Sequence, residues 1–206
     1  LLKISAKYRN APTPPFEACF STFGKRLIKQ LVQLHPLPIL LNGPTGWGKS
    51  VFARELAARV GQPYVGINAH PGLDMSWLVG MWKPKPLQNG LTVEWQDGVL
   101  TNAVRGGSVL LFEELTRAPQ EAVGRIFGLL DHGFRYWSLP EAGVESIAVH
   151  PNFWMIATAN PPTTEYRVSR LDKALESRFA AIITVDKAIA DEPALLRSLV
   201  GSKPAA

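Results

Sequence analysis

With 206 residues, 46% of them hydrophobic and 19% charged, the chain is long enough for one well-buried core and too short for two ordinary domains. Its net charge of +5, from 22 lysines and arginines against 17 acidic residues, favours anionic partners without choosing among nucleotides, nucleic acids and acidic protein surfaces. A single cysteine excludes an internal disulfide and a cysteine-rich zinc site, and no apolar run approaches the roughly 18–20 residues of a membrane helix, so we expect a cytoplasmic protein that does not bind membranes.

Helices and short apolar strands are predicted to alternate along the chain. A Pro- and Ala-rich segment, residues 1–15, is expected to be flexible and to precede a helix within residues 16–35. Five apolar runs, each flanked by Gly, Pro or polar residues, occur at 37–42, 63–68, 108–114, 153–160 and 180–186. They do not alternate with polar residues, which is typical of strands buried on both faces of a parallel sheet. Amphipathic helices at 49–60 and 119–132 complete a predicted three-layer α/β domain.

Two segments interrupt this alternation and are predicted to be inserted β-hairpins. In residues 82–98, Asn89-Gly90 is a strong turn signal and LTVEW alternates like a half-exposed strand. In residues 134–151, two strand-like arms flank a turn at 140–143. Four tryptophans lie in or near these hairpins and are expected mostly to pack onto the core, namely Trp77, Trp82, Trp95 and Trp137.

The first apolar run leads directly into GPTGWGKS, residues 43–50, which matches the phosphate-loop pattern G-x-x-x-x-G-K-[ST] between a predicted strand and a predicted helix. Such glycines let backbone N–H groups surround phosphate oxygens, while the helix presents its positive end to the anion. Lys49 is predicted to reach the β- and γ-phosphates and Ser50 to bind Mg²⁺. The alternative is a Gly-rich turn with an incidental lysine. The predicted nucleotide-binding residues are Gly43, Pro44, Thr45, Gly46, Trp47, Gly48, Lys49, Ser50 and Val51.

Polar side chains end two further strands at the carboxyl edge of the predicted sheet, where α/β proteins bind ligands. SVLLFEEL ends in Glu113, a candidate Mg²⁺ ligand through water, and Glu114, a candidate general base that orients and deprotonates the attacking water. A solvated strand end is the other interpretation of this pair. The fourth run ends in Thr158 and Asn160. Asn160 either caps the turn at the following prolines or hydrogen-bonds the γ-phosphate or the attacking water.

The chain contains four motifs that resemble those of AAA+ ATPases and occur in the same order as in that family. Among the AAA+ ATPases, the chain resembles the MoxR-like group with its CbbQ/NorQ and dynein-related relatives. GPTGWGKS is similar to the family's Walker A, VLLFEELTRAPQEAVGRIFGLLDHG to its Walker B and following helix, FWMIATANPP to its sensor 1 strand, and RLDKALESRF to the helix with the arginine finger. The resemblance implies a three-layer αβα P-loop NTPase domain over residues 16–190, with a five-stranded parallel sheet and two inserted β-hairpins. Residues 191–206 would be a stub that leads towards a helical lid not contained in this sequence.

The resemblance also implies a function. The chain would bind ATP and Mg²⁺, hydrolyse ATP within a homo-oligomeric, hexameric ring, and remodel or activate a client protein, in some relatives through a partner with a von Willebrand factor A domain. Glu114 would be the general base, Asn160 sensor 1, and Arg178 the finger. Arg178 would lack a partner in its own chain because it acts on the γ-phosphate of the next subunit. Arg125 and Arg170 are rival fingers.

Departures from the family pattern keep two alternative functions open. Glu113 stands where the family usually has aspartate, and Arg117 lies in Thr-Arg-Ala rather than Asn-Arg-Ala. The altered Walker B and the lack of a lid favour a nucleotide-gated assembly module with little turnover. The net positive charge, together with Lys83, Lys85 and Arg135 in the hairpins, favours a nucleic-acid motor of the minichromosome-maintenance type. The sequence has no dedicated DNA-binding motif, however.

Overall fold

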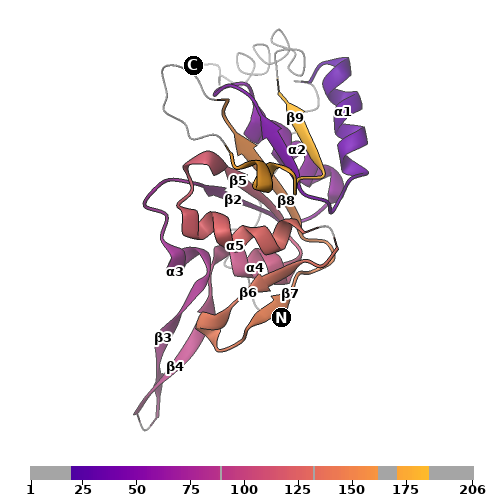
Figure 1. The fold of residues 1–206 in the computed structure, drawn as a ribbon. Coiled ribbons are helices and arrows are strands. Elements are labelled where there is room, and N and C mark those ends of the chain that lie inside the picture. Colours follow the sequence, from indigo (N-terminus) through magenta and orange to yellow (C-terminus); the bar gives the residue numbers. More distant parts are fainter. Residues whose placement is uncertain (1–19, 89, 132, 162–170, 186–206) are drawn as a thin grey trace, which may run out of the picture.

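The computed structural model, drawn in Figure 1, describes residues 20–88, 90–131, 133–161 and 171–185. The predicted flexible segment 1–15, the stub 191–206 and the rival finger Arg170 lie outside these residues. Within the described ranges, no helix has the length and apolar character that crossing a bilayer requires.

A five-stranded parallel sheet forms the centre of the domain (Figure 1). Its strands, in the order in which they lie side by side, are β2 (Tyr64–Asn68), β5 (Val109–Glu113), β8 (Trp154–Ala159), β1 (Ile39–Asn42) and β9 (Ala181–Thr184). Each lies within one of the five apolar runs, which confirms the predicted strands. All neighbouring pairs are parallel, so the carboxyl ends of the strands meet at one edge of the sheet.

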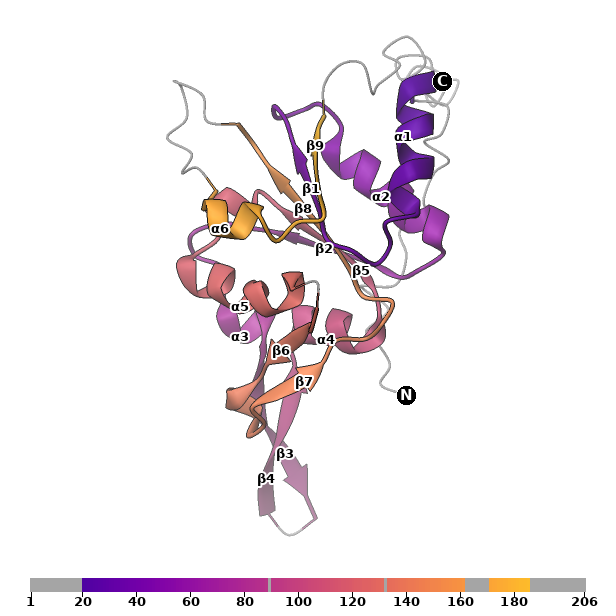
Figure 2. The same cartoon turned by 45° about the vertical axis from the view of Figure 1, so that its right-hand side comes forward.

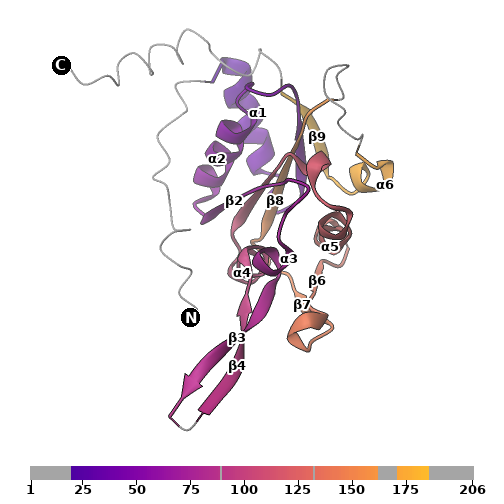
Figure 3. The ribbon, with the colours of Figure 1, turned by 90° about the vertical axis from the view of Figure 1, so that its left-hand side faces the viewer.

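Helices cover both faces of this sheet, as Figures 2 and 3 show. One face carries α1 (Thr22–Val32) and α2 (Lys49–Val60), and the other carries α3 (Met75–Leu78), α4 (Val99–Gly106), α5 (Gln120–Leu130) and α6 (Lys173–Glu176). Successive side chains of a strand point to opposite faces. Ile39 and Leu41 therefore pack with the first pair of helices, and Leu40 packs with the second group. The predicted three-layer fold is confirmed.

The ends of the helices follow from local sequence. α2 covers the predicted residues 49–60, because Gly48 and Gly61, with φ of 77° and 67°, take the left-handed conformation that interrupts a helix on either side. α5 was expected to extend to residue 132 but ends at Leu130. The cause is Asp131, whose side-chain Oδ1 accepts hydrogen bonds from the backbone N–H groups of Gly133 and Phe134 and thereby begins a turn.

Both predicted hairpins are present. β3 (Gly80–Leu87) pairs with β4 (Gly90–Asp97) in a long antiparallel ribbon that projects away from the body of the domain (Figures 1 and 3). β6 (Tyr136–Ser138) and β7 (Ser146–Ala148) form a shorter hairpin beside α5. The projecting ribbon begins two residues earlier than its predicted start at residue 82.

The tryptophans of the hairpins have different surroundings. Trp137 is fully buried and donates to the hydroxyl of Thr101 over 2.8 Å, as the expected packing requires. Trp82, by contrast, is 50% exposed, so the prediction is wrong for this residue. Its indole N–H donates to the carbonyl of Glu141 over 2.8 Å, and its ring lies edge to face with Trp95 at 5.7 Å. Trp82 therefore joins the two hairpins to each other.

The close packing of the short hairpin against α5 depends on a glycine. A methyl group at Gly128 would lie 2.7 Å from the carbonyl oxygen of Tyr136 and 3.0 Å from its ring, which is closer than side-chain carbons approach such atoms. Gly124, one turn earlier in the same helix, has nothing within 4 Å of that position.

This pair of glycines gives a matched test of the packing. We expect Gly128→Ala to lower the free energy of unfolding by about 1–3 kcal/mol, because the added methyl pushes the hairpin away from α5. Gly124→Ala should raise it by about 0.5–1 kcal/mol, since alanine loses less backbone freedom in a helix. Urea unfolding of both variants measures the difference. Equal effects of the two substitutions would contradict the packing described here.

Candidate functional site

The carboxyl edge of the sheet holds a cavity of about 320 Å³. This volume is at the lower end of the range of small-molecule sites. The cavity is lined by the loop between β1 and α2, by the ends of β2, β5 and β8, and by the polar residues just beyond them. Segments that are far apart in the sequence therefore meet there, as the predicted motifs require.

The loop between β1 and α2 has the shape that its glycines allow. Gly46 and Gly48 have φ of 85° and 77°, which residues with a side chain rarely adopt. Gly43 is needed for another reason: a methyl group there would collide with the carbonyl oxygen of Val185, just beyond β9. The loop consequently turns from the buried strand into α2 and brings Lys49 to the first position of that helix.

Lys49 connects the loop to β8. Its ammonium donates to the carbonyl oxygens of Gly43 and Pro44 over 2.6 and 2.7 Å and to Oδ1 of Asn160 over 2.9 Å. The residue is only 8% exposed. Burial lowers the pKa of the Lys49 ammonium below its ordinary value of 10.5, while the charges of Glu114 and Glu113 oppose that shift. Three oxygens thus satisfy a cation that has lost most of its water.

Ser50 and Glu113 contact each other in the wall of the cavity. The Ser50 hydroxyl donates to Oε1 of Glu113, the last residue of β5. A hydroxyl beside a carboxylate is an oxygen donor set of the kind that Mg²⁺ prefers. The residues present therefore fit the predicted magnesium site.

Glu114 has an unusual backbone conformation. Its φ of 55° and ψ of 45° make it the one non-glycine residue with positive φ among those that the structure describes. Its N–H donates to the hydroxyl of Thr158 over 3.0 Å, and its carboxylate accepts from Arg117 over 2.6 Å. Glu114 also lines the cavity. These contacts give Arg117, which the sequence left without a role, a partner in the site.

The candidate fingers differ in what they contact. Arg178 follows α6, donates to the carbonyl of Ala174 over 2.8 Å, and places its guanidinium 4.7 Å from the centre of the Phe127 ring. The prediction that it has no partner in its own chain is therefore wrong, although within the described ranges no carboxylate pairs with it. Arg125 is occupied by Glu141 and by the carbonyl of Ser138.

Sequence reasoning missed two residues of this site. Asn68, the last residue of β2, lines the cavity. It ends an apolar run with a polar side chain, the same signal that identified Asn160, so it could have been found. Thr158 was noted only as a strand end, and the sequence gives no signal for its contact with Glu114.

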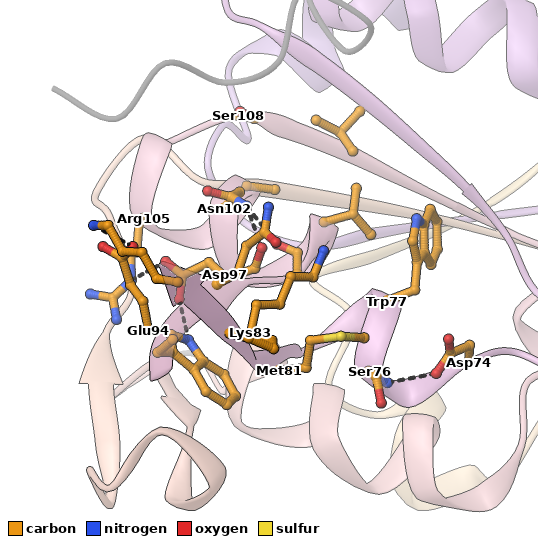
Figure 4. A pocket seen from close by; sticks show the side chains of 18 of the residues that line it. Asp74, Ser76, Trp77, Met81, Lys83, Glu94, Asp97, Asn102, Arg105 and Ser108 are labelled. Atoms are coloured by element: carbon orange, nitrogen blue, oxygen red, sulfur yellow. Dashed lines mark hydrogen bonds and ion pairs between the residues drawn. The ribbon is translucent and has the colours of Figure 1, made fainter. Parts of the chain in front are cut away.

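A larger cavity, of about 990 Å³, lies at the base of the β3–β4 hairpin (Figure 4). None of the predicted site residues lines it. Its charged side chains are largely paired with one another, Arg105 with Asp97 and Lys85 with Glu94, each over 2.8 Å. The smaller cavity at the sheet edge is therefore the one in which the motifs converge.

Comparison with known proteins identifies the family of the chain. The model of a family described as "AAA domain (dynein-related subfamily)" matches residues 38–179. The chain belongs to the AAA ATPases. Within them it belongs to the dynein-related subfamily, and its resemblance to the MoxR-like group is confirmed.

Two relatives and one solved structure illustrate the likeness. Protein NorQ of Paracoccus denitrificans and Protein CbbQ of Hydrogenophilus thermoluteolus are 37% and 32% identical to this chain, each over 146 residues, 71% of this chain and 52% of the relative. The chain thus spans about half the length of these curated relatives. The crystal structure of a candidate ATPase from Cytophaga hutchinsonii is 20% identical, with a TM-score of 0.61 over 90% of this chain and 53% of that one. It supports the fold.

The buried ammonium of Lys49 should make stability depend on alkaline pH. At a pH below the lowered pKa that Lys49 has in the folded protein, its ammonium is charged in both the folded and the unfolded chain. Between that pKa and the unfolded value of 10.5, the unfolded chain keeps a proton that the folded chain releases, so the free energy of unfolding rises with pH. We expect the stability of the wild type relative to Lys49→Met to increase in urea unfolding as the pH rises towards 10.5. A constant or falling difference would contradict this.

Proposed function

We propose that this domain binds ATP with Mg²⁺ and hydrolyses it. The observation that carries the proposal is the convergence of Lys49, Asn160 and the two carboxylates of Glu113 and Glu114 in one cavity beside the glycine loop. Membership of the AAA family implies nucleotide binding. The loop amides and the N-terminus of α2 would hold the phosphates, and Lys49 would exchange its loop carbonyls for phosphate oxygens.

Each site residue has a role in this proposal. Ser50 and Glu113 would hold Mg²⁺, which when bound neutralises charge on the phosphates. Glu114 would accept a proton from the attacking water, and Asn160 would contact the γ-phosphate while it keeps Lys49 in place. Gly43, Pro44, Thr45, Gly46, Trp47, Gly48 and Val51 would complete the nucleotide cradle.

We further assign Arg178 as the trans-acting finger of a homo-oligomeric, hexameric ring. No carboxylate within the described residues neutralises its guanidinium, and its resting contacts with Phe127 and with one carbonyl are weak enough to exchange. Arg125 is the weaker candidate because Glu141 already pairs with it. A guanidinium that reaches the γ-phosphate of the neighbouring subunit stabilises the charge of the transition state, so turnover would require assembly.

The projecting β3–β4 hairpin supports the proposal that the ring acts on a client protein, directly or through a partner with a von Willebrand factor A domain. The exposed hydrophobic residues of this hairpin include Leu87, Leu91 and Val93, and the hairpin extends away from the nucleotide site (Figure 1). Nucleotide-dependent movement of this ribbon would be the output of the cycle.

The nucleic-acid motor is less well supported by the contacts of the basic residues. Arg135 donates to the carbonyls of Pro36, Pro151 and Phe153, and burial lowers its pKa, so it acts as a structural cation. Lys85 pairs with Glu94. The assembly module with little turnover is the stronger alternative, because Glu113 replaces the usual aspartate and the carboxylate of Glu114 is bound by Arg117.

Glu114→Gln distinguishes hydrolysis from binding alone. The amide keeps the shape of the side chain but accepts no proton, so we expect single-turnover phosphate release to fall at least about 100-fold while ATP affinity is retained. Glu121→Gln, on the exposed side of α5, is the matched control and should turn over at the wild-type rate. A wild type that binds ATP and releases no phosphate in its assembled form would favour the assembly module.

Mixing two inactive variants tests the trans finger. Arg178→Ala should lose about 10³–10⁵-fold in turnover while it still binds ATP. When it is mixed with Glu114→Gln, some interfaces combine an intact Glu114 of one subunit with an intact Arg178 of the next, so part of the activity should return. If the mixture stays as inactive as its components, Arg178 does not act across the interface.

A further inference from the structure

The conformation of Glu114 requires an explanation, because the left-handed region is unfavourable for a residue with a β-carbon. Glycine would occupy this position without strain, yet the chain has a glutamate at the edge of the phosphate cavity. Such strain persists only where surrounding contacts impose it, and it is concentrated at functional sites. The contact that imposes it here therefore bears on the reaction.

The hydroxyl of Thr158 is that contact. The regular pairing of β5 with β8 ends at Phe112 and Ala157, whereas Glu113, the last residue of β5, still pairs with Asn68 of β2. The next strand residue on β8, Thr158, accepts the N–H of Glu114 over 3.0 Å. Thr158 is 3% exposed and lines the cavity. The hydroxyl of Thr158 takes the place of a backbone carbonyl as the acceptor. It holds Glu114 at a position that the backbone hydrogen bonds between β5 and β8 do not reach.

The rest of the backbone of Glu114 is fixed from the other side. The N–H of Arg117 donates to the carbonyl of Glu114 over 2.8 Å and closes a 3₁₀ turn, Leu115–Arg117. With both backbone groups of Glu114 occupied, its carboxylate moves only by rotation about its side-chain bonds. That rotation carries it between Arg117, which binds it in this structure, and the cavity that Glu114 lines.

Thr158 is also related to Lys49 by strand geometry. Asn160, two residues further along, accepts from the Lys49 ammonium. Residues two apart on an extended chain point to the same side. One end of β8 thus sets both the phosphate-binding lysine and the backbone of the proposed base.

We infer that Thr158 is a positioning residue for Glu114. Its hydroxyl holds the backbone conformation from which the carboxylate reaches the attacking water, so it acts on the reaction through Glu114. This inference rests on the proposed hydrolysis of ATP and adds to it the residue that orients the base.

The test compares Thr158→Val, which has the same shape without the hydroxyl's bonding, with Thr158→Ser, which keeps the hydroxyl. We expect the valine variant of the full chain to lose about tenfold or more in kcat, because a misplaced base accepts the proton less well. Its KM for ATP should stay within about twofold, since the phosphate contacts are unchanged. The serine variant should recover most of kcat.

Thr101→Val is the matched control. Thr101 is equally buried, and its hydroxyl donates to the carbonyl of Val79 and accepts from Trp137, outside the site. We expect its unfolding midpoint to fall while kcat per folded molecule stays at the wild-type value. If Thr158→Val does not fold, Thr158→Ala gives the same comparison.

The outcomes separate the inference from the proposed function. Three results would overturn the role of Thr158 alone, provided that the wild type turns over. They are an unchanged kcat in Thr158→Val, a raised KM of Thr158→Val at constant kcat, and a kcat of Thr158→Ser as low as that of Thr158→Val. A wild type that releases no phosphate when assembled would overturn the proposed hydrolysis and, with it, this role.

Discussion

The need to satisfy the buried ammonium of Lys49 organises the site. A cation that is 8% exposed loses most of its hydration, and only directed oxygen atoms restore that loss. Two of these oxygens belong to the loop that precedes Lys49 and the third to Asn160, after β8. The contact therefore holds the glycine loop in a turned conformation and ties it to the strand whose other polar residue, Thr158, holds Glu114.

The order of the strands makes this arrangement available. Because β8 lies between β5 and β1, the residues at and just beyond the carboxyl ends of these three strands are neighbours at one edge, although they come from positions 43–50, 113–114 and 158–160. On the face covered by α5, a second set of contacts leads away from this edge. α5 carries Phe127, which lies against Arg178, and Arg125, which pairs with Glu141 of the short hairpin. The carbonyl of Glu141 accepts from Trp82, so the projecting hairpin belongs to the same set.

Features specified by neighbouring residues could be predicted from the sequence. The strands lie within their apolar runs, and α2 has its predicted bounds because glycines flank it. The gathering of Lys49, Ser50, Glu113, Glu114 and Asn160 followed from the rule that parallel strands end at one edge. Features that depend on contacts between distant segments could not be predicted. The exposure of Trp82 depends on where the second hairpin lies, and the Phe127 ring beside Arg178 comes from another helix. Thr158 shows the same limit. A threonine at the end of a strand has the same sequence pattern whether its hydroxyl caps a turn or positions a catalytic base.

The central claim is that the phosphates of ATP replace the loop carbonyls around Lys49, and calorimetric titration with Mg-ATP tests it most directly. We expect saturable binding of one nucleotide per chain by the wild type and an affinity at least about tenfold lower for Lys49→Met, which fills the same space without the charge. Equal affinity of the two proteins, or no detectable binding by the folded wild type, would contradict it.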